Sequence, residues 1–174
     1  ISFAADSRGL DKIPHYPIQI YGNNNNSIFK LSEAKNFLYI INGGLYNSKD
    51  DFLGAIIQTN YDIIIVDLFF HGDIIFTEEE ISSLKIKPGG GKRLVIAYMS
   101  IGEAEDYRYY WERSWNRNPP GWLGDENPDW KGNYKVHYWE SEWQEIIYGN
   151  DYSYLKKIID AGFDGVYLDI IDAF

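Results

Sequence analysis

The 174-residue chain contains no cysteine, and its basic side chains are far outnumbered by acidic ones. The absence of cysteine excludes disulfides, thiolate metal ligands and cysteine nucleophiles. With 16 Lys and Arg against 26 Asp and Glu, the formal net charge is −10. Such a surface repels nucleic-acid phosphates and anionic lipid, and it attracts cations or cationic polymers. We therefore expect neither a nucleic-acid partner nor a membrane partner.

Several motifs that mark common ligand sites are also missing. No apolar run approaches the ~18–20 residues that a membrane-spanning helix needs. The segment GGGKR at 89–93 lacks the Walker spacing and a following Ser or Thr, which predicts a plain loop. His71 and His137 lack ligand-like spacing with the acids, and no Ser-His-Asp or dinucleotide-binding fingerprint is present. The sequence thus predicts neither a metal site nor a cofactor.

Aromatic residues, in contrast, are abundant. They make up 17% of the chain, with 15 Tyr and 6 Trp. Flat rings stack on sugar faces, but they also build cores, so this composition hints at carbohydrate without establishing it. The stretch WERSWNRNPPGWLGDENPDW at 111–130 places four Trp among Pro, Gly and charged residues. Two interpretations stay open for it: a rim loop that stacks on sugars, or a loop packed upon itself.

Strand-like and helix-like segments alternate from residue 36 onward. Residues 1–35 are predicted to be an extension or linker, with the polar run YGNNNNSIFK as a loop. The predicted strands, rich in β-branched and aromatic residues, are 36–42, 61–70, 92–102, 134–139 and 165–171. The predicted helices, with N-caps at Ser48, Thr77, Ser141 and Asp151, are 48–59, 77–88, 141–149 and 151–162, and a further helix is expected over 103–115.

Repeated strand-then-helix units indicate an α/β fold of parallel strands joined by right-handed crossovers. Two architectures fit. A doubly wound open sheet is complete with five strands, in the order 2-1-3-4-5. A (β/α)₈ TIM barrel needs eight strands and usually ~200–250 residues, so this chain would be only part of one. Length favours the open sheet and the motifs favour the barrel; the strand order distinguishes them.

Acidic and aromatic residues stand where the predicted strands end. Asp67 ends the second strand, Glu103 follows the third, Trp139 the fourth, and Asp169 and Asp172 the fifth. In either architecture, the loops after parallel strands form one rim where catalytic groups gather. Each acid also has a structural interpretation. Asp67 and Asp172 could cap helices or form ion pairs, and Glu103 could begin a helix.

The fifth strand is the most informative of these. Its period of two places Tyr167 and Asp169 on one face and aliphatic residues on the other. If the aliphatic face packs on helices, Tyr167 and Asp169 point into the barrel mouth, where a charge is costly unless it is paired or used. Asp164 precedes this strand, so we predict that it is a turn residue at the opposite end of the sheet.

Three segments resemble a known family. VIAYMSIGEAEDYRYYW (95–111), NPDWKGNYKVHYWESEWQEII (127–147) and AGFDGVYLDIIDAF (161–174) are similar to the endo-α-1,4-polygalactosaminidase family of glycoside hydrolases. Members of this family are also labelled cysteinyl-tRNA-synthetase-related proteins. That label finds no support here, because the HIGH and KMSKS motifs are absent and no cysteine could bind zinc.

The resemblance implies a (β/α)₈ barrel, of which residues 36–174 would form the N-terminal part, about five βα units. It also implies two-carboxylate hydrolysis of a galactosamine-containing, possibly cationic polysaccharide, with Asp169 as one catalytic carboxylate. The partner acid is expected on a later strand. The residues expected to line the sugar cleft are Asp67, Tyr98, Glu103, Trp139, Tyr167 and Asp172. A substrate of this kind implies a secreted or cell-surface protein. The alternatives are a non-catalytic carbohydrate-binding barrel and a flavodoxin-like ligand-binding domain.

Overall fold

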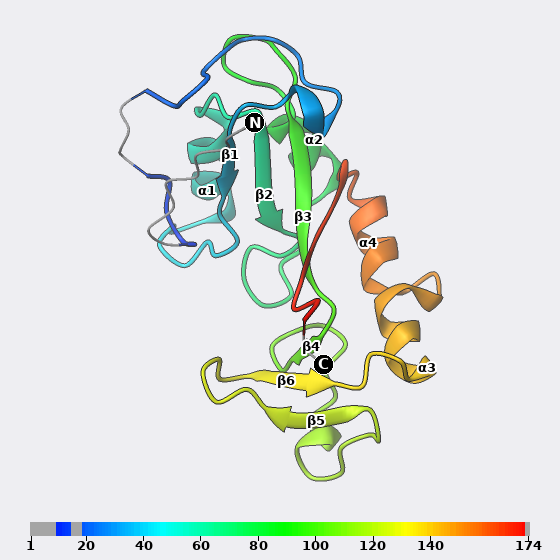
Figure 1. Cartoon of the computed structure of the whole chain (residues 1–174). Coiled ribbons are helices and arrows are strands. Elements are labelled where there is room, and N and C mark those ends of the chain that lie inside the picture. The colour runs from blue at the N-terminus through cyan, green and yellow to red at the C-terminus, as the bar shows by residue number, and fades with distance from the viewer. Residues whose placement is uncertain (1–9, 15–18, 173–174) are drawn as a thin grey trace. The chain divides into compact units, whose positions relative to one another are not determined.

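The computed structural model describes residues 10–14 and 19–172 (Figure 1). Residues 1–9 and 15–18 of the predicted extension lie outside the described residues. The chain divides into two compact units. Unit 1 comprises Ile1–Tyr98 and Asp160–Tyr167, and unit 2 comprises Met99–Ile159 and Leu168–Phe174. In the described ranges, no helix combines the length and the apolar character needed to cross a lipid bilayer.

Unit 1 is built on a four-stranded sheet whose strands follow the order β1-β2-β3-β7 (Figure 1). The strands are β1 (Phe37–Tyr39), β2 (Ile63–Asp67), β3 (Leu94–Ser100) and β7 (Gly165–Asp169), and the last residues of β3 and β7 belong to unit 2. β1 pairs in parallel with β2, and β2 pairs in parallel with β3. This sequential order contradicts the 2-1-3-4-5 order of the doubly wound alternative.

Two helices accompany this sheet, and their beginnings follow the predicted capping chemistry. Helix α1 (Lys49–Ile57) begins after Ser48, whose Oγ accepts a 3.1 Å hydrogen bond from Asp51 N. Helix α2 (Glu78–Leu84) begins with a capping box, in which Thr77 and Glu80 each accept a hydrogen bond from the other's backbone N–H. Both predicted N-caps are confirmed.

The two faces of the sheet differ in what covers them. Side chains facing the helices, such as Ile64, Val95 and Ala97, are fully buried. The opposite face is also apolar, yet it opens onto a hollow of about 720 Å³. The sheet residues that line this hollow are Phe37, Tyr39, Ile63, Ile65, Leu94, Ile96, Gly165, Val166 and Tyr167. Phe29 and Leu31, from the segment before β1, also line the hollow and remain more than half exposed.

Unit 2 contains a second sheet, of three antiparallel strands in the order β4-β6-β5 (Figure 1). They are β4 (Glu103–Glu105), β5 (Leu123–Glu126) and β6 (Asn133–Val136), with a 3₁₀ turn at Arg113–Asn116. Two predictions are therefore wrong. Residues 103–115 do not form a helix. The segment 134–139 does contain a strand, β6, but this strand belongs to the antiparallel sheet and not to the parallel one. The parallel sheet thus has four strands rather than the five expected.

The helical segment predicted at 141–149 is confirmed, whereas the helix predicted at 151–162 is shorter in the structure. Helix α3 (Ser141–Gln144) continues into a π-helical turn (Glu145–Gly149), and Ser141 is its first residue rather than its N-cap. Helix α4 (Tyr154–Asp160) begins after Ser153, whose Oγ accepts a hydrogen bond from Lys156 N. The N-cap predicted at Asp151 is therefore wrong. A Ser two residues further along supplies the oxygen instead.

A buried ion pair closes the amino end of the unit 1 sheet. Lys87 Nζ lies 2.5 Å from Asp62 Oδ1, and both side chains are 0% exposed. The same ammonium donates to the backbone carbonyls of Asn24 and Asn26, so the asparagine run wraps around it. A Cβ at Gly89 or Gly91 would collide with Asn25, which explains the glycines of the GGGKR segment.

We predict that Lys87→Met lowers the free energy of unfolding by about 3–5 kcal/mol, because it leaves the Asp62 carboxylate buried without its cation. Lys85→Met is the matched control. Lys85 pairs with Asp164 at 2.6 Å, but both side chains keep about a quarter of their exposure. That pair should be worth about 0–1 kcal/mol. Urea denaturation of the two variants tests the difference, and equal losses would contradict it.

Candidate active site

Asp67 and Tyr98 lie side by side where β2 and β3 run toward their carboxyl ends, as their register pairing shows. Asp67 is the last residue of β2 and is only 6% exposed. Its Oδ1 accepts a 3.0 Å hydrogen bond from Phe69 N, which stabilises the turn after the strand. Asp67 does not cap α2, since Thr77 does so. The hydrogen bond to Phe69 N helps to fix the strand end, and the place of Asp67 in the sugar cleft stays a prediction.

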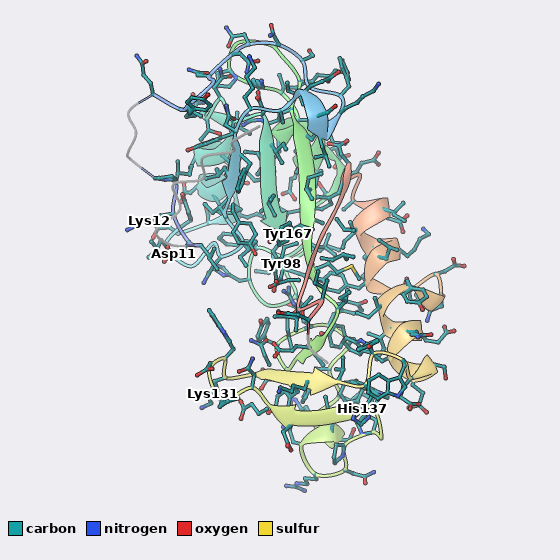
Figure 2. The ribbon with its side chains drawn as sticks, in the orientation of Figure 1. Asp11, Lys12, Tyr98, Lys131, His137 and Tyr167 are labelled. Atoms are coloured by element: carbon teal, nitrogen blue, oxygen red, sulfur yellow. The ribbon has the colours of Figure 1, made fainter. Side chains whose placement is uncertain are left out.

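Three tyrosines cluster in unit 1. The ring of Tyr39 lies 6.4 Å from that of Tyr98 and 5.4 Å from that of Tyr167, centroid to centroid. Tyr98 and Tyr167 are labelled in Figure 2. Tyr98 is buried and Tyr167 is 44% exposed. The structure therefore brings two predicted site residues together around Tyr39, which the sequence analysis did not select. Its position at the end of β1, on the face of Phe37, was the available signal.

Asp169 ends β7 and is half-buried. Its backbone carbonyl accepts a 3.2 Å hydrogen bond from Ile101 N, which places its main chain beside the segment that leads into β4. Ile170 follows with φ 56°, in the left-handed region that a β-branched residue rarely adopts. Strain of this kind concentrates at functional sites. Asp172 lies in the exposed turn beyond.

Strand β4 carries two buried acids, Glu103 and Glu105. The carboxylate of Glu105 accepts hydrogen bonds from Arg108 Nε at 2.5 Å and from the Tyr107 hydroxyl at 2.6 Å. The Glu103 carboxylate accepts one from the side-chain amide of Asn127, at 2.7 Å. Asn127 follows β5, so the antiparallel sheet holds Glu103 through a residue that the sequence analysis missed. We know of no local sequence signal for a contact across 24 residues.

Burial and nearby charge keep the tyrosines around this strand neutral. Burial raises the pKa of Tyr110 well above its usual value, and the charge of Glu105 raises it further. Burial also raises the pKa of Tyr109 to about 12. The two rings meet edge to face, and Tyr110 packs likewise on Trp143. These phenols therefore support the strand as neutral groups rather than as proton carriers.

The Trp-rich stretch is largely packed upon itself. Trp115 contacts Trp111 and Trp122 edge to face, and Trp122 lies 5.0 Å from Trp143, centroid to centroid. Trp122 and Trp143 are almost fully buried. The self-packed interpretation is correct for these rings, and Trp122 and Trp143 belong to the buried core of unit 2. Trp130 is the exception within the stretch, at 62% exposed.

Trp139 lies beyond β6 and is 58% exposed. The His137 ring stacks on it with an interplanar angle of 13° and a centroid distance of 5.0 Å. Figure 2 labels His137 past the end of β6, and Lys131 in the turn before that strand. Trp139 thus presents an exposed aromatic surface, and its contact with a sugar stays a prediction.

The predicted site residues fall into two groups. Asp67, Tyr98 and Tyr167 belong to unit 1, whereas Glu103, Trp139, Asp169 and Asp172 belong to unit 2. Within the described ranges, no group of three or more His, Cys, Asp or Glu side chains is placed to hold a metal ion. The chemistry available in each unit is therefore that of carboxylates and aromatic rings.

Comparisons of the whole chain with known proteins point to one family. The family model described as "Glycoside-hydrolase family GH114" matches residues 21–174. The uncharacterized protein MJ1477 of Methanocaldococcus jannaschii is 49% identical over 131 residues, which cover 74% of this chain and 36% of that protein. An uncharacterized protein of Thermotoga maritima is 46% identical over 67% of this chain and 34% of its own length. This chain spans about a third of the length of these relatives.

Among solved structures, the crystal structure of Aspergillus fumigatus Ega3 in complex with galactosamine is similar to this chain. The two are 27% identical, with a TM-score of 0.48. The match covers 66% of this chain and 39% of the Ega3 chain.

We predict that Ile170→Gly lowers the free energy of unfolding less than Ile171→Gly does. Ile171 is 67% exposed and Ile170 is half-buried, so burial alone predicts the opposite order. At Ile171 the substitution should cost about 1 kcal/mol through chain entropy. At Ile170, relief of the left-handed strain, about 1–3 kcal/mol, offsets that cost. Thermal denaturation of both variants decides the order, and a larger loss at Ile170 would contradict the strain.

Proposed function

Because the chain belongs to glycoside-hydrolase family GH114, we propose that the protein hydrolyses the glycosidic bonds of a galactosamine-containing polysaccharide. The family match over residues 21–174 is the observation that carries the hydrolysis of glycosidic bonds, and the galactosamine substrate rests on the resemblance of three sequence segments to endo-α-1,4-polygalactosaminidases. Asp169 is the proposed catalytic carboxylate within this chain. It ends a strand of the parallel sheet, which is where α/β enzymes place their catalytic groups.

The reaction needs two carboxyl groups on either side of the glycosidic bond. One protonates the leaving oxygen, and the other attacks the anomeric carbon or activates a water molecule. We assign the second role to Asp169, as nucleophile or base. The partner acid, which protonates the leaving oxygen, is proposed to lie on a later strand of the full-length protein. If the two catalytic acids both belong to this chain, Glu103 takes the role of the partner acid. The separation of the pair decides whether the sugar configuration is retained or inverted.

The architecture that we propose around these residues is the first part of a (β/α)₈ barrel. Its support is the sequential strand order β1-β2-β3-β7, which such a barrel requires of its successive strands. The second support is the apolar face that lines the 720 Å³ hollow, because branched aliphatic side chains fill a barrel interior. Further strands closing the barrel would cover Ile63, Ile65 and Ile96.

Charge supports the choice of substrate. A deacetylated galactosamine polymer carries free amines, and a chain with a net charge of −10 attracts a polycation. Exposed aromatic rings such as Trp139 and Tyr167 would stack on its sugar rings. The rival function is sugar binding without hydrolysis, and turnover of the polymer separates the two.

We predict that Asp169→Asn lowers kcat on a deacetylated α-1,4-galactosamine oligomer by about 10²–10⁴-fold in the full-length protein. Binding of the oligomer should persist, since the amide keeps the shape of the carboxylate. Asp151→Asn is the matched control, because Asp151 lies in an exposed turn and should leave kcat unchanged. Product release is measured by reducing-end assay, and binding by calorimetry. Undiminished turnover in Asp169→Asn would refute the assignment.

A further inference from the structure

The two buried acids of β4 differ in what neutralises them. Glu105 is paired with the guanidinium of Arg108 through two hydrogen bonds, of 2.5 and 3.1 Å. Glu103, two residues earlier and on the same face of the strand, is 5% exposed. Its carboxylate forms no ion pair with any residue that the structure describes, and its side-chain partner is the neutral amide of Asn127. One acid is thus compensated within the fold and the other is not.

Burying a carboxylate without a cation is costly, and a neutral donor recovers only part of that cost. A cation was available within the sheet, because Lys135 stands opposite Glu103 in the β4–β6 register. Lys135 is nevertheless exposed, and in the described structure it does not pair with Glu103. The fold therefore leaves the Glu103 charge uncompensated although a lysine is directly across the ladder.

The turn between β5 and β6 fixes how Asn127 meets this acid. Asn127 Oδ1 accepts a 3.0 Å hydrogen bond from Asp129 N, so its Nδ2 group must face Glu103. Asn127 N donates to the Asn133 carbonyl at 2.7 Å and closes the turn. Gly132 adopts φ 87° there, and its N–H donates to Glu126 Oε1. The amide is thus held in one orientation and occupies Glu103 Oε1.

The second oxygen of Glu103 stays available. Among the described residues, the side-chain atoms buried without a partner are Asn60 Oδ1 and Arg93 Nε, and Glu103 Oε2 is not one of them. Since no described residue bonds to Oε2 either, this oxygen is not sealed from solvent, although Glu103 as a whole is 5% exposed. A cationic group at this oxygen would meet a carboxylate without a cation of its own, and the low exposure of the residue strengthens the attraction.

We propose that Glu103 is the residue that recognises the free amine of the substrate, with Oε2 accepting a charge-assisted hydrogen bond from a protonated amino sugar. Asn127 is a positioning residue that holds the carboxylate through Oε1. This inference rests on the proposed function for the identity of the sugar. It adds a chemical basis for preferring deacetylated over N-acetylated galactosamine, because an acetamide carries no charge.

The test compares the affinities of the full-length protein for fully deacetylated and fully N-acetylated α-1,4-galactosamine oligomers. Glu103→Gln keeps the acceptor for Asn127 and removes only the charge. It should weaken binding of the deacetylated oligomer by about 10- to 100-fold and leave the acetylated one unchanged. Glu142→Gln, at an exposed glutamate of α3, is the matched control and should alter neither affinity. Calorimetry in the Asp169→Asn background prevents consumption of the ligand.

Two further variants define the outcome. Lys135→Met should keep the preference for the deacetylated oligomer, and its loss would overturn the inference by showing that Lys135 shapes the site. Asn127→Ala should reduce the preference without affecting the acetylated oligomer. Equal weakening of both oligomers in Glu103→Gln would overturn the inference as well. If Glu103→Gln leaves both affinities unchanged in that background, and the unmodified protein still cleaves the deacetylated oligomer, only this inference fails. If the unmodified protein binds neither oligomer, this inference and the proposed function both fail.

Discussion

A charge buried in a protein must be compensated, and the buried acids of this chain meet this requirement in different ways. Asp62 lies at the amino end of the unit 1 sheet and pairs with Lys87, while its Oδ2 accepts a hydrogen bond from Lys35 N. Glu105 pairs with Arg108 in unit 2. The charge of each of these acids is therefore balanced by a cation of the same chain. Glu103 has an amide and no cation among the described residues, which distinguishes it from Asp62 and Glu105.

Position along a strand gives the same division. Asp164 and Asp169 flank β7, five residues apart. Asp164, before the strand, accepts from Val95 N at 2.8 Å and pairs with Lys85, so it joins β7 to its neighbours as a turn residue. Asp169 ends the strand and is followed by the strained Ile170. One strand therefore has a stabilising acid at its amino end and the candidate catalytic acid at its carboxyl end, as in other parallel α/β folds.

Local chemistry made much of unit 1 predictable. The caps at Ser48 and Thr77 depend on side chains within three residues, and the apolar run of β2 is typical of a buried strand. The structure of unit 2 was harder to predict from the sequence. Residues 103–115 contain good helix formers, but pairing of β4 with β6 and packing of Tyr110 on Trp143 determine their conformation. These contacts join residues far apart in sequence, so propensity could not reveal them.

The site shows the same limit. Asp169 and Glu103 were selected because strand ends are visible in a sequence, whereas Asn127 was missed because nothing near it points to β4. The left-handed conformation of Ile170 was also missed, since Gly or Asn is what a sequence usually offers there. A residue whose type opposes its conformation must be held by its surroundings. The backbone bond from Ile101 to Asp169 is one such restraint, and it ties the end of β7 to the segment that leads into Glu103.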